Sequence, residues 1–193
     1  MAEPNLRTAP LAHRDNPKLA IWLYLGGDVV LFGTLILTYW MFRLRAPADF
    51  IAAKAHLSIP LIALNTFVLI LSSFMVVQAL EAVRDGRQAA LRNYLFAVMA
   101  LGALFVGGQA FEWSSLYRDG IWFSSIFGTP FFTITGLHGS HVLVGLIWCA
   151  YLQFGIRKGA YTQSRHLGIE TFGLYWHFVD VVWIVLFTFF YLI

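Results

Sequence analysis

The last stretch of the chain, residues 168–193, is a long apolar segment that carries the ionisable side chains Glu170, His177 and Asp180. As a helix with a rise of about 1.5 Å per residue, it would extend to roughly 39 Å, enough to cross a bilayer core of about 30 Å. At about 100° per residue, His177 falls within about 20° of Glu170 and Asp180 within about 80°, so one face carries all three. Because an ionisable group at this depth costs on the order of 3 kcal/mol or more, that face must point into protein.

Composition extends this constraint to the whole chain. Hydrophobic residues make up 59% of the 193 residues and charged residues 12%, whereas soluble domains carry about 25% charged residues. We therefore predict an all-α integral membrane protein, a single bundle of five transmembrane helices over residues 18–193 with no separate soluble domain. The segments expected to form these helices span about 18–42, 60–83, 94–117, 130–156 and 168–193.

The first stretch, residues 1–17, contains prolines and scattered charges but no apolar run. We expect a flexible tail rather than a cleavable signal. Nine of the Lys and Arg residues fall in this tail, at Lys18 directly after it, and in the second and fourth loops, and four fall on the other side of the segments. This asymmetry predicts a cytoplasmic N-terminus and an external C-terminus. The formal net charge of +3 gives no indication of a nucleic-acid surface.

The apolar segments contain several ionisable side chains that a passive membrane anchor would not need. One explanation is a polar network that locks the helices together and grips lipid headgroups, and we favour it. A proton relay along a wet crevice is the second explanation, and metal or haem ligation is the third. The candidate site residues are Asp28, Glu112, His138, His141, Glu170, His177 and Asp180.

Other motifs argue against a self-contained enzyme. The chain has no phosphate-binding glycine loop, CxxC pair, nucleophile elbow or Glu-x-x-His pair, so we assign no catalytic, cofactor-binding or metal-binding residue. Cys149 lies inside an apolar segment and is expected to be a packed small residue. The seven Trp residues include several near the expected membrane interfaces, where a belt is the default interpretation. The absence of an internal repeat weakens the hypothesis of a transporter with inverted repeats.

Four stretches resemble one protein family, subunit III of the haem-copper oxidases. Two signature helices of this family closely resemble GIETFGLYWHFVDVVW at 168–183 and FFTITGLHGSHVLVG at 131–145. Its third and first core helices resemble GQAFEW at 108–113 and YLGGDVVLFG at 24–33. The likeness covers about residues 18–193 and corresponds to a compact five-helix form without the two extra N-terminal helices of longer members.

The resemblance implies a non-redox subunit of a proton-pumping terminal respiratory oxidase that passes electrons from cytochrome c to O2. Its partners would be oxidase subunit I as the main contact, subunit II, and membrane phospholipids. Haems and copper are expected in the partner subunits and not in this chain. Phospholipid would occupy a V-shaped cleft between the first two helices and the others. The subunit would sustain proton uptake and protect the catalytic centre, in the bacterial plasma (inner) membrane.

Residue by residue, the resemblance places Asp28 at the buried carboxylate of the first core helix, where many cytochrome c oxidases have Glu. Glu170 favours a cytochrome c oxidase, because quinol oxidase versions often lack an acid there, whereas Asp28 points the other way. We favour cytochrome c as the donor. Alternatives are subunit III of a quinol oxidase, a nitric oxide reductase accessory subunit, and a free-standing haem-binding membrane cytochrome. The remaining matches to helix-locking and lipid-facing polar positions are Glu112, His138, His141, His177 and Asp180.

Overall fold

The computed structural model describes residues 17–193, a bundle of long helices with no β-strand in this range. The predicted tail lies outside the described residues except for Pro17, which begins the first helix. Five helical segments within the described range are long and apolar enough to cross a membrane, which confirms the predicted all-α fold. The elements are α1 (Pro17–Arg45), α2 (Pro47–Lys54), α3 (Ile59–Arg84), α4 (Gln88–Arg118), α5 (Gly128–Arg157), α6 (Leu167–Phe187) and the π-helical η1 (Thr188–Leu192).

Three features differ from the helix bounds expected from the sequence. Helix α4 begins at Gln88 rather than near residue 94, because the run that follows the turn consists of good helix formers. A short helix, α2, forms where a loop was expected; Pro47 suits its first turn, and Phe50 is buried against the bundle. The last segment is α-helical only to Phe187 and then widens into the π-helical turn η1.

The connections that follow α3 and α5 begin with the same turn geometry. Gly86 and Gly159 follow α3 and α5 with φ angles of 75° and 70°, a region that a residue without Cβ adopts without strain. The next amide in each case donates back into the last helical turn, Arg87 to the Ala82 carbonyl and Ala160 to the Gly155 carbonyl. Both helices therefore stop sharply at the same end of the bundle.

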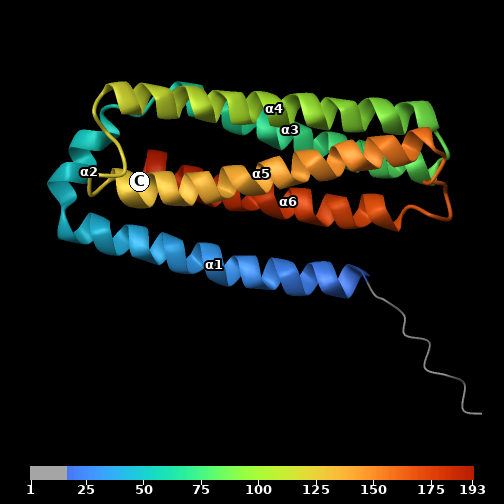
Figure 1. The fold of residues 1–193 in the computed structure, drawn as a ribbon, viewed down its shortest axis with the longest axis horizontal. Coiled ribbons are helices and arrows are strands. Elements are labelled where there is room, and N and C mark those ends of the chain that lie inside the picture. The colour runs from blue at the N-terminus through green and yellow to red at the C-terminus, as the bar shows by residue number, and fades with distance from the viewer. Residues whose placement is uncertain (1–16) are drawn as a thin grey trace, which may run out of the picture.

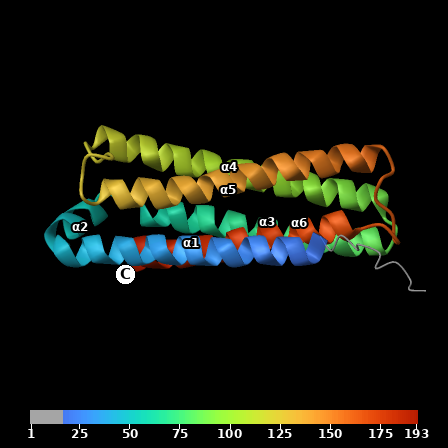
Figure 2. The same ribbon diagram turned by 60° about the horizontal axis from the view of Figure 1, so that its bottom comes forward.

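The long helices form a four-helix bundle with one additional helix on its side. Helices α3, α4, α5 and α6 pack in a ring, and α1 packs against α5 and α6 (Figures 1 and 2). Half of the most apolar window of α6 is buried, compared with 17% for α1, so α6 is the central helix and α1 the peripheral one. The start of α1, the α3–α4 turn and the α5–α6 loop share one end, which we call the basic end; α2 and η1 lie at the opposite end (Figure 1).

Two tryptophans of α6 lie in the core rather than at a membrane interface. Trp176 and Trp183 are fully buried. The ring of Trp176 occupies a slot made by glycines of α4 and α5: a Cβ added at Gly145 would lie 2.6 Å from it, and one at Gly102 would lie 3.0 Å from it. The helices can approach α6 this closely because those positions lack side chains.

Candidate functional site

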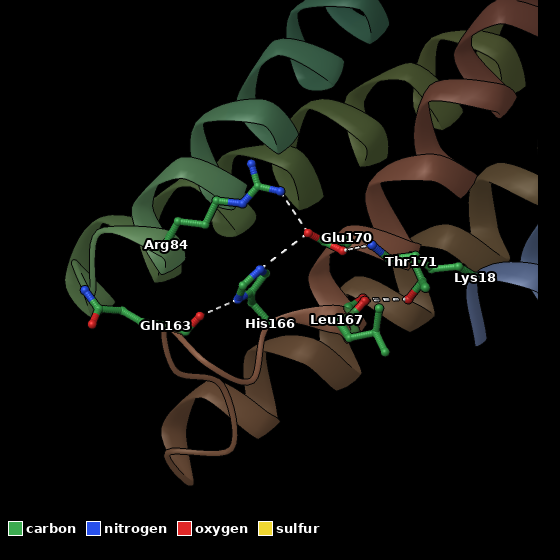
Figure 3. A network of polar contacts seen from close by, with 8 residues as sticks. Lys18, Arg84, Gln163, His166, Leu167, Glu170 and Thr171 are labelled. Carbon is green, nitrogen blue, oxygen red and sulfur yellow. Dashed lines mark hydrogen bonds and ion pairs between the residues drawn. The ribbon is translucent and has the colours of Figure 1, made fainter. Parts of the chain in front are cut away.

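Glu170 joins three helices at the basic end of the bundle. It lies in the first turn of α6, and its carboxylate oxygens are 2.5 Å from Lys18 Nζ of α1 and 2.8 Å from Arg84 of α3 (Figure 3). His166, just before α6, lies 3.4 Å from the same carboxylate, and its other ring nitrogen is 2.6 Å from the Gln163 carbonyl. The Glu170 side chain is only 15% exposed, but those of Lys18 and Arg84 are about half exposed, so water screens these ion pairs in part. Glu170 thus ties α1 and α3 to α6.

Asp28 and His141 form a buried pair between α1 and α5. The His141 Nε2 atom lies 3.5 Å from an Asp28 carboxylate oxygen, and both side chains are largely shielded. The His141 Nδ1 atom is 2.8 Å from the Leu137 carbonyl one turn earlier on α5. The Tyr24 hydroxyl also interacts with Asp28, and the Tyr175 hydroxyl donates to the His141 carbonyl at 2.8 Å. The pair is therefore held from several sides.

The bonding of His141 fixes where protons can be in this pair. Because a carbonyl only accepts hydrogen bonds, the Nδ1 atom facing Leu137 must carry a hydrogen. The Nε2 atom then attracts Asp28 only if one further proton lies on Nε2 or on the carboxyl group. The geometry therefore provides a place for one exchangeable proton between α1 and α5.

A ladder of side-chain hydrogen bonds joins α6 to α3. His177 Nδ1 lies 2.5 Å from the Ser73 hydroxyl, and the Trp176 indole donates to the Ser72 hydroxyl at 2.9 Å. Further along, the Trp183 indole donates to a Thr66 hydroxyl at 2.9 Å. Asp180 is buried on the same face, and neither of its carboxylate oxygens has a hydrogen-bond partner within residues 17–193. The polar face predicted for the last segment is therefore turned toward α3 over much of its length.

Glu112 and Tyr191 join α4 to the C-terminal turn. The Tyr191 hydroxyl donates to a Glu112 carboxylate oxygen at 2.5 Å, and Gln109 donates to the same oxygen at 3.4 Å. Both members of the pair are almost completely buried. The π-helical turn η1 carries Tyr191 and so determines where its hydroxyl lies. Glu112 therefore anchors the end of the last membrane segment.

His138 differs from the other candidate residues because it packs as an aromatic ring. Its imidazole stacks on Trp183 at a centroid distance of 4.9 Å and meets Phe105 edge-on at 5.9 Å. The ring is 1% exposed, and neither nitrogen has a hydrogen-bond partner within residues 17–193. Phe32 of α1 contacts both His138 and His141, at 6.5 and 5.4 Å between centroids. His138 therefore fills space between α1, α4 and α6.

The imidazoles of His138 and His141 are both engaged with protein groups. His138 and His141 belong to the same helix; the first is enclosed by aromatic rings, and both nitrogens of the second face protein groups. Haem ligation requires a nitrogen that faces room for the macrocycle. Within residues 17–193, no group of three or more His, Cys, Asp or Glu side chains is arranged to hold a metal ion.

Sequence reasoning missed the hydroxyl partners of the site. Ser72, Ser73 and Thr66 lie on α3 among apolar residues, and Tyr191 lies in the C-terminal turn. A serine pair inside an apolar helix is a usable signal, because hydroxyls commonly bond across membrane helices. No such signal selects Tyr191, since its direction depends on the π-helical turn.

Fold and site together define a multi-pass helical membrane protein in which several ionisable side chains join its own helices. The family model described as cytochrome c oxidase subunit III matches residues 13–193. The chain therefore belongs to the cytochrome c oxidase subunit III family.

The relatives include subunits of cytochrome c oxidases and subunits of quinol oxidases. "Cytochrome c oxidase subunit 3" of Synechocystis is 34% identical over 94% of this chain and 77% of its own length. "Quinol oxidase subunit 3" of Bacillus subtilis is 33% identical over 97% of this chain and 94% of its own length. "Cytochrome bo(3) ubiquinol oxidase subunit 3" of Pseudomonas putida is 34% identical over 91% of this chain and 84% of its own length.

Proposed function

We propose that this chain is the non-redox subunit III of a proton-pumping terminal oxidase that takes electrons from cytochrome c. Its family makes it one subunit of an oxidoreductase complex, with other subunits as partners. We assign subunit I as its main partner and subunit II as a second one. The complex would lie in the bacterial plasma membrane, with the basic end of this chain in the cytoplasm.

One observation carries the non-redox role: three of the ionisable side chains bond to other helices and so hold the bundle together. Glu170 bonds to α1 and α3, Glu112 bonds to η1, and His177 bonds to α3. Side chains used in this way stabilise one arrangement of the bundle and present that arrangement to a partner. Haems and copper would then lie in the partner subunits.

Lipid binding finds support in a groove between α1 and α6. The groove has a volume of about 360 Å³, and its lining is apolar apart from His177. Trp22 and Val29 contribute from α1, and Phe178 and Val181 contribute from α6. An acyl chain suits such a surface because the chain and the groove lining are both apolar. We propose this groove as the place where the subunit holds phospholipid.

Support of proton uptake would belong to the Asp28 and His141 pair, which can hold one exchangeable proton. The variant Asp28→Asn keeps the size of the side chain but removes its charge. We expect an intact complex with slower proton uptake, measured with a pH-indicator dye during turnover in reconstituted vesicles. Unchanged uptake at unchanged subunit content would contradict this role and leave the pair as a helix lock.

The donor and the partners are tested by purification in mild detergent. The complex that contains this chain would be identified by mass spectrometry and by its reduced-minus-oxidised spectrum. Haem a with a copper-binding subunit supports the cytochrome c oxidase assignment. Quinol oxidase activity without cytochrome c oxidation would instead establish the quinol alternative, which the relatives from Bacillus and Pseudomonas support. Haem b with a nitric oxide reductase subunit would identify that accessory role, and stoichiometric haem in the isolated chain would overturn the non-redox assignment.

A further inference from the structure

A second groove lies between α4 and α5 at the basic end, away from the polar network. It has a volume of about 470 Å³, and Arg92 from α4 and Arg157 from α5 both line it. These residues come from the first turns of α4 and the last turns of α5, which lie side by side at this end (Figure 1). The two helices are tied there by a hydrogen bond from Gln153 to the Arg92 carbonyl at 2.8 Å. The groove is thus a fixed feature of helix packing.

The cations of this groove lack partners within the protein. Neither the Arg92 nor the Arg157 guanidinium makes a hydrogen bond or ion pair with any residue from 17 to 193. Lys158 adds a third cation at the rim, 4.3 Å from the centre of the Phe154 ring. At the same end of the bundle, Lys18 and Arg84 both form ion pairs with Glu170. One cationic cluster therefore has an acidic partner among the described residues, and the other does not.

The polarity of the groove changes along the helices in the way a phospholipid requires. Phe96 and Met99 of α4 form part of the groove wall. They lie about one turn and two turns beyond Arg92, further from the basic end. The antiparallel α5 contributes Ala150 at the same depth and Arg157 at the mouth. Phe96 is 67% exposed, so it faces the surroundings of the bundle rather than its core. The charge lies at the end and the apolar surface lies toward the membrane interior.

We propose that this groove binds one anionic phospholipid, with its phosphate between Arg92 and Arg157 and an acyl chain along Phe96 and Met99. Guanidinium groups recognise phosphate oxygens with paired hydrogen bonds, and unpaired cations at a membrane surface attract anionic lipid. An acidic peptide of a partner subunit would match the arginines but not the exposed apolar floor. The groove is separate from the one between α1 and α6, and the proposal does not depend on the electron donor.

The test uses the whole purified complex, stripped of loose lipid by detergent and incubated with vesicles of phosphatidylcholine and phosphatidylglycerol in equal amounts. Retained lipids are then counted by mass spectrometry across a titration. The double variant Arg92→Gln/Arg157→Gln should bind phosphatidylglycerol about thirtyfold more weakly, because each cation contributes about fivefold. Its retention of phosphatidylcholine should not change.

A matched control removes equal charge from the same end of the protein. The double variant Arg87→Gln/Arg165→Gln changes exposed side chains that do not line the groove and should bind phosphatidylglycerol like the unaltered complex. A third variant, Ala150→Trp, fills the floor without changing charge and should also reduce retention.

Three results would overturn the proposal. Equal loss in the two double variants would indicate a diffuse effect of surface charge. Retention unchanged in the Arg92→Gln/Arg157→Gln or Ala150→Trp complex would show that the lipid does not lie in the groove. Loss of a protein subunit from Arg92→Gln/Arg157→Gln at unchanged lipid content would show that the groove binds a protein instead.

Discussion

The role of an ionisable residue in this protein depends on which side chains it contacts and how exposed it is. Glu170 and Asp85 are both acids at the basic end, yet Glu170 is shielded between two helices and Asp85 pairs with Arg87 in an exposed turn. Removing one member of a shielded pair costs more than removing one member of an exposed pair, because the remaining charge is left uncompensated where water screens it less. Acids of similar chemistry therefore differ in structural importance according to depth and geometry.

Replacing Glu170 by Gln should destabilise the chain by about 1.5–3 kcal/mol, because charge-assisted bonds to Lys18 and Arg84 are lost. The measurement is the free energy of unfolding of the purified chain in a denaturing-detergent titration. The control Asp85→Asn removes an exposed pair and should cost less than about 1 kcal/mol. An equal effect of the two variants would contradict the assignment of Glu170 as a link between helices.

Tyr191 should be important for a different reason, since its hydroxyl donates to the buried carboxylate of Glu112. The variant Tyr191→Phe preserves the ring but leaves that oxygen with only the longer bond from Gln109. We expect a loss of about 1–3 kcal/mol in the same titration. Tyr151→Phe, at an exposed ring, is the control and should be neutral. If Tyr191→Phe is neutral as well, the hydroxyl does not anchor the end of the chain.

At the scale of elements, close packing of α6 depends on glycines of its neighbours. The large Trp176 ring sits in a slot between α4 and α5 that exists only because Gly102 and Gly145 have no side chain. The indole hydrogen bond to Ser72 then fixes the ring against α3. One side chain of α6 thus contacts every other helix of the ring.

The substitution Gly145→Ala tests this packing. Its Cβ would lie 2.6 Å from Trp176, so α5 or the ring must move, and we expect a loss of about 1–3 kcal/mol. Gly139→Ala on the same helix meets no atom within 4 Å and should be neutral or stabilising, because alanine favours helix by up to about 1 kcal/mol over glycine. The comparison can be read from thermal unfolding of the two variants. Similar melting temperatures would show that the slot can adjust.

At the scale of the whole molecule, α1 is attached to a self-contained ring of four helices by polar contacts spaced along its length. Lys18 meets Glu170 at the basic end, and Asp28 meets His141 further along. At the opposite end, Arg43 donates to the Ile193 carbonyl at 2.6 Å. Because little of α1 is buried, these contacts determine its position more than apolar packing does.

For the assembled complex, we expect substitution of the polar face of α6 to affect integrity more than electron transfer. His177→Leu or Asp180→Leu removes polar groups that face α3 and Ser73. The complex should lose this subunit or its lipid during detergent washing, detected by gel and lipid analysis, while the first turnovers of intact complexes stay normal. A complex that keeps subunit and lipid but fails from the first turnover would indicate a direct role in proton transfer.

The all-α fold and the membrane-length helices follow from the sequence, because long apolar runs have few alternatives in a bilayer. Helical periodicity alone also predicts the polar face of residues 168–193. In the structure, this face is turned toward α3. The short helix α2 was missed because its few apolar residues are stable as a helix only against the bundle. The electron donor, the partners and the bound lipid stay predictions that neither the helix pattern nor the packing tests.

The sequence by itself determined where chain segments must be helical and that their ionisable groups must avoid lipid, since both follow from the cost of placing polar groups in hydrocarbon. Only the tertiary structure decided which groups meet: Glu170 with Lys18 and Arg84, and Asp28 with His141. The same packing left Arg92 and Arg157 beside an open groove without a partner among the described residues. These pairings depend on how helices distant in sequence are rotated against one another, and helix rotation is set by the fit of side chains such as Trp176 into their neighbours.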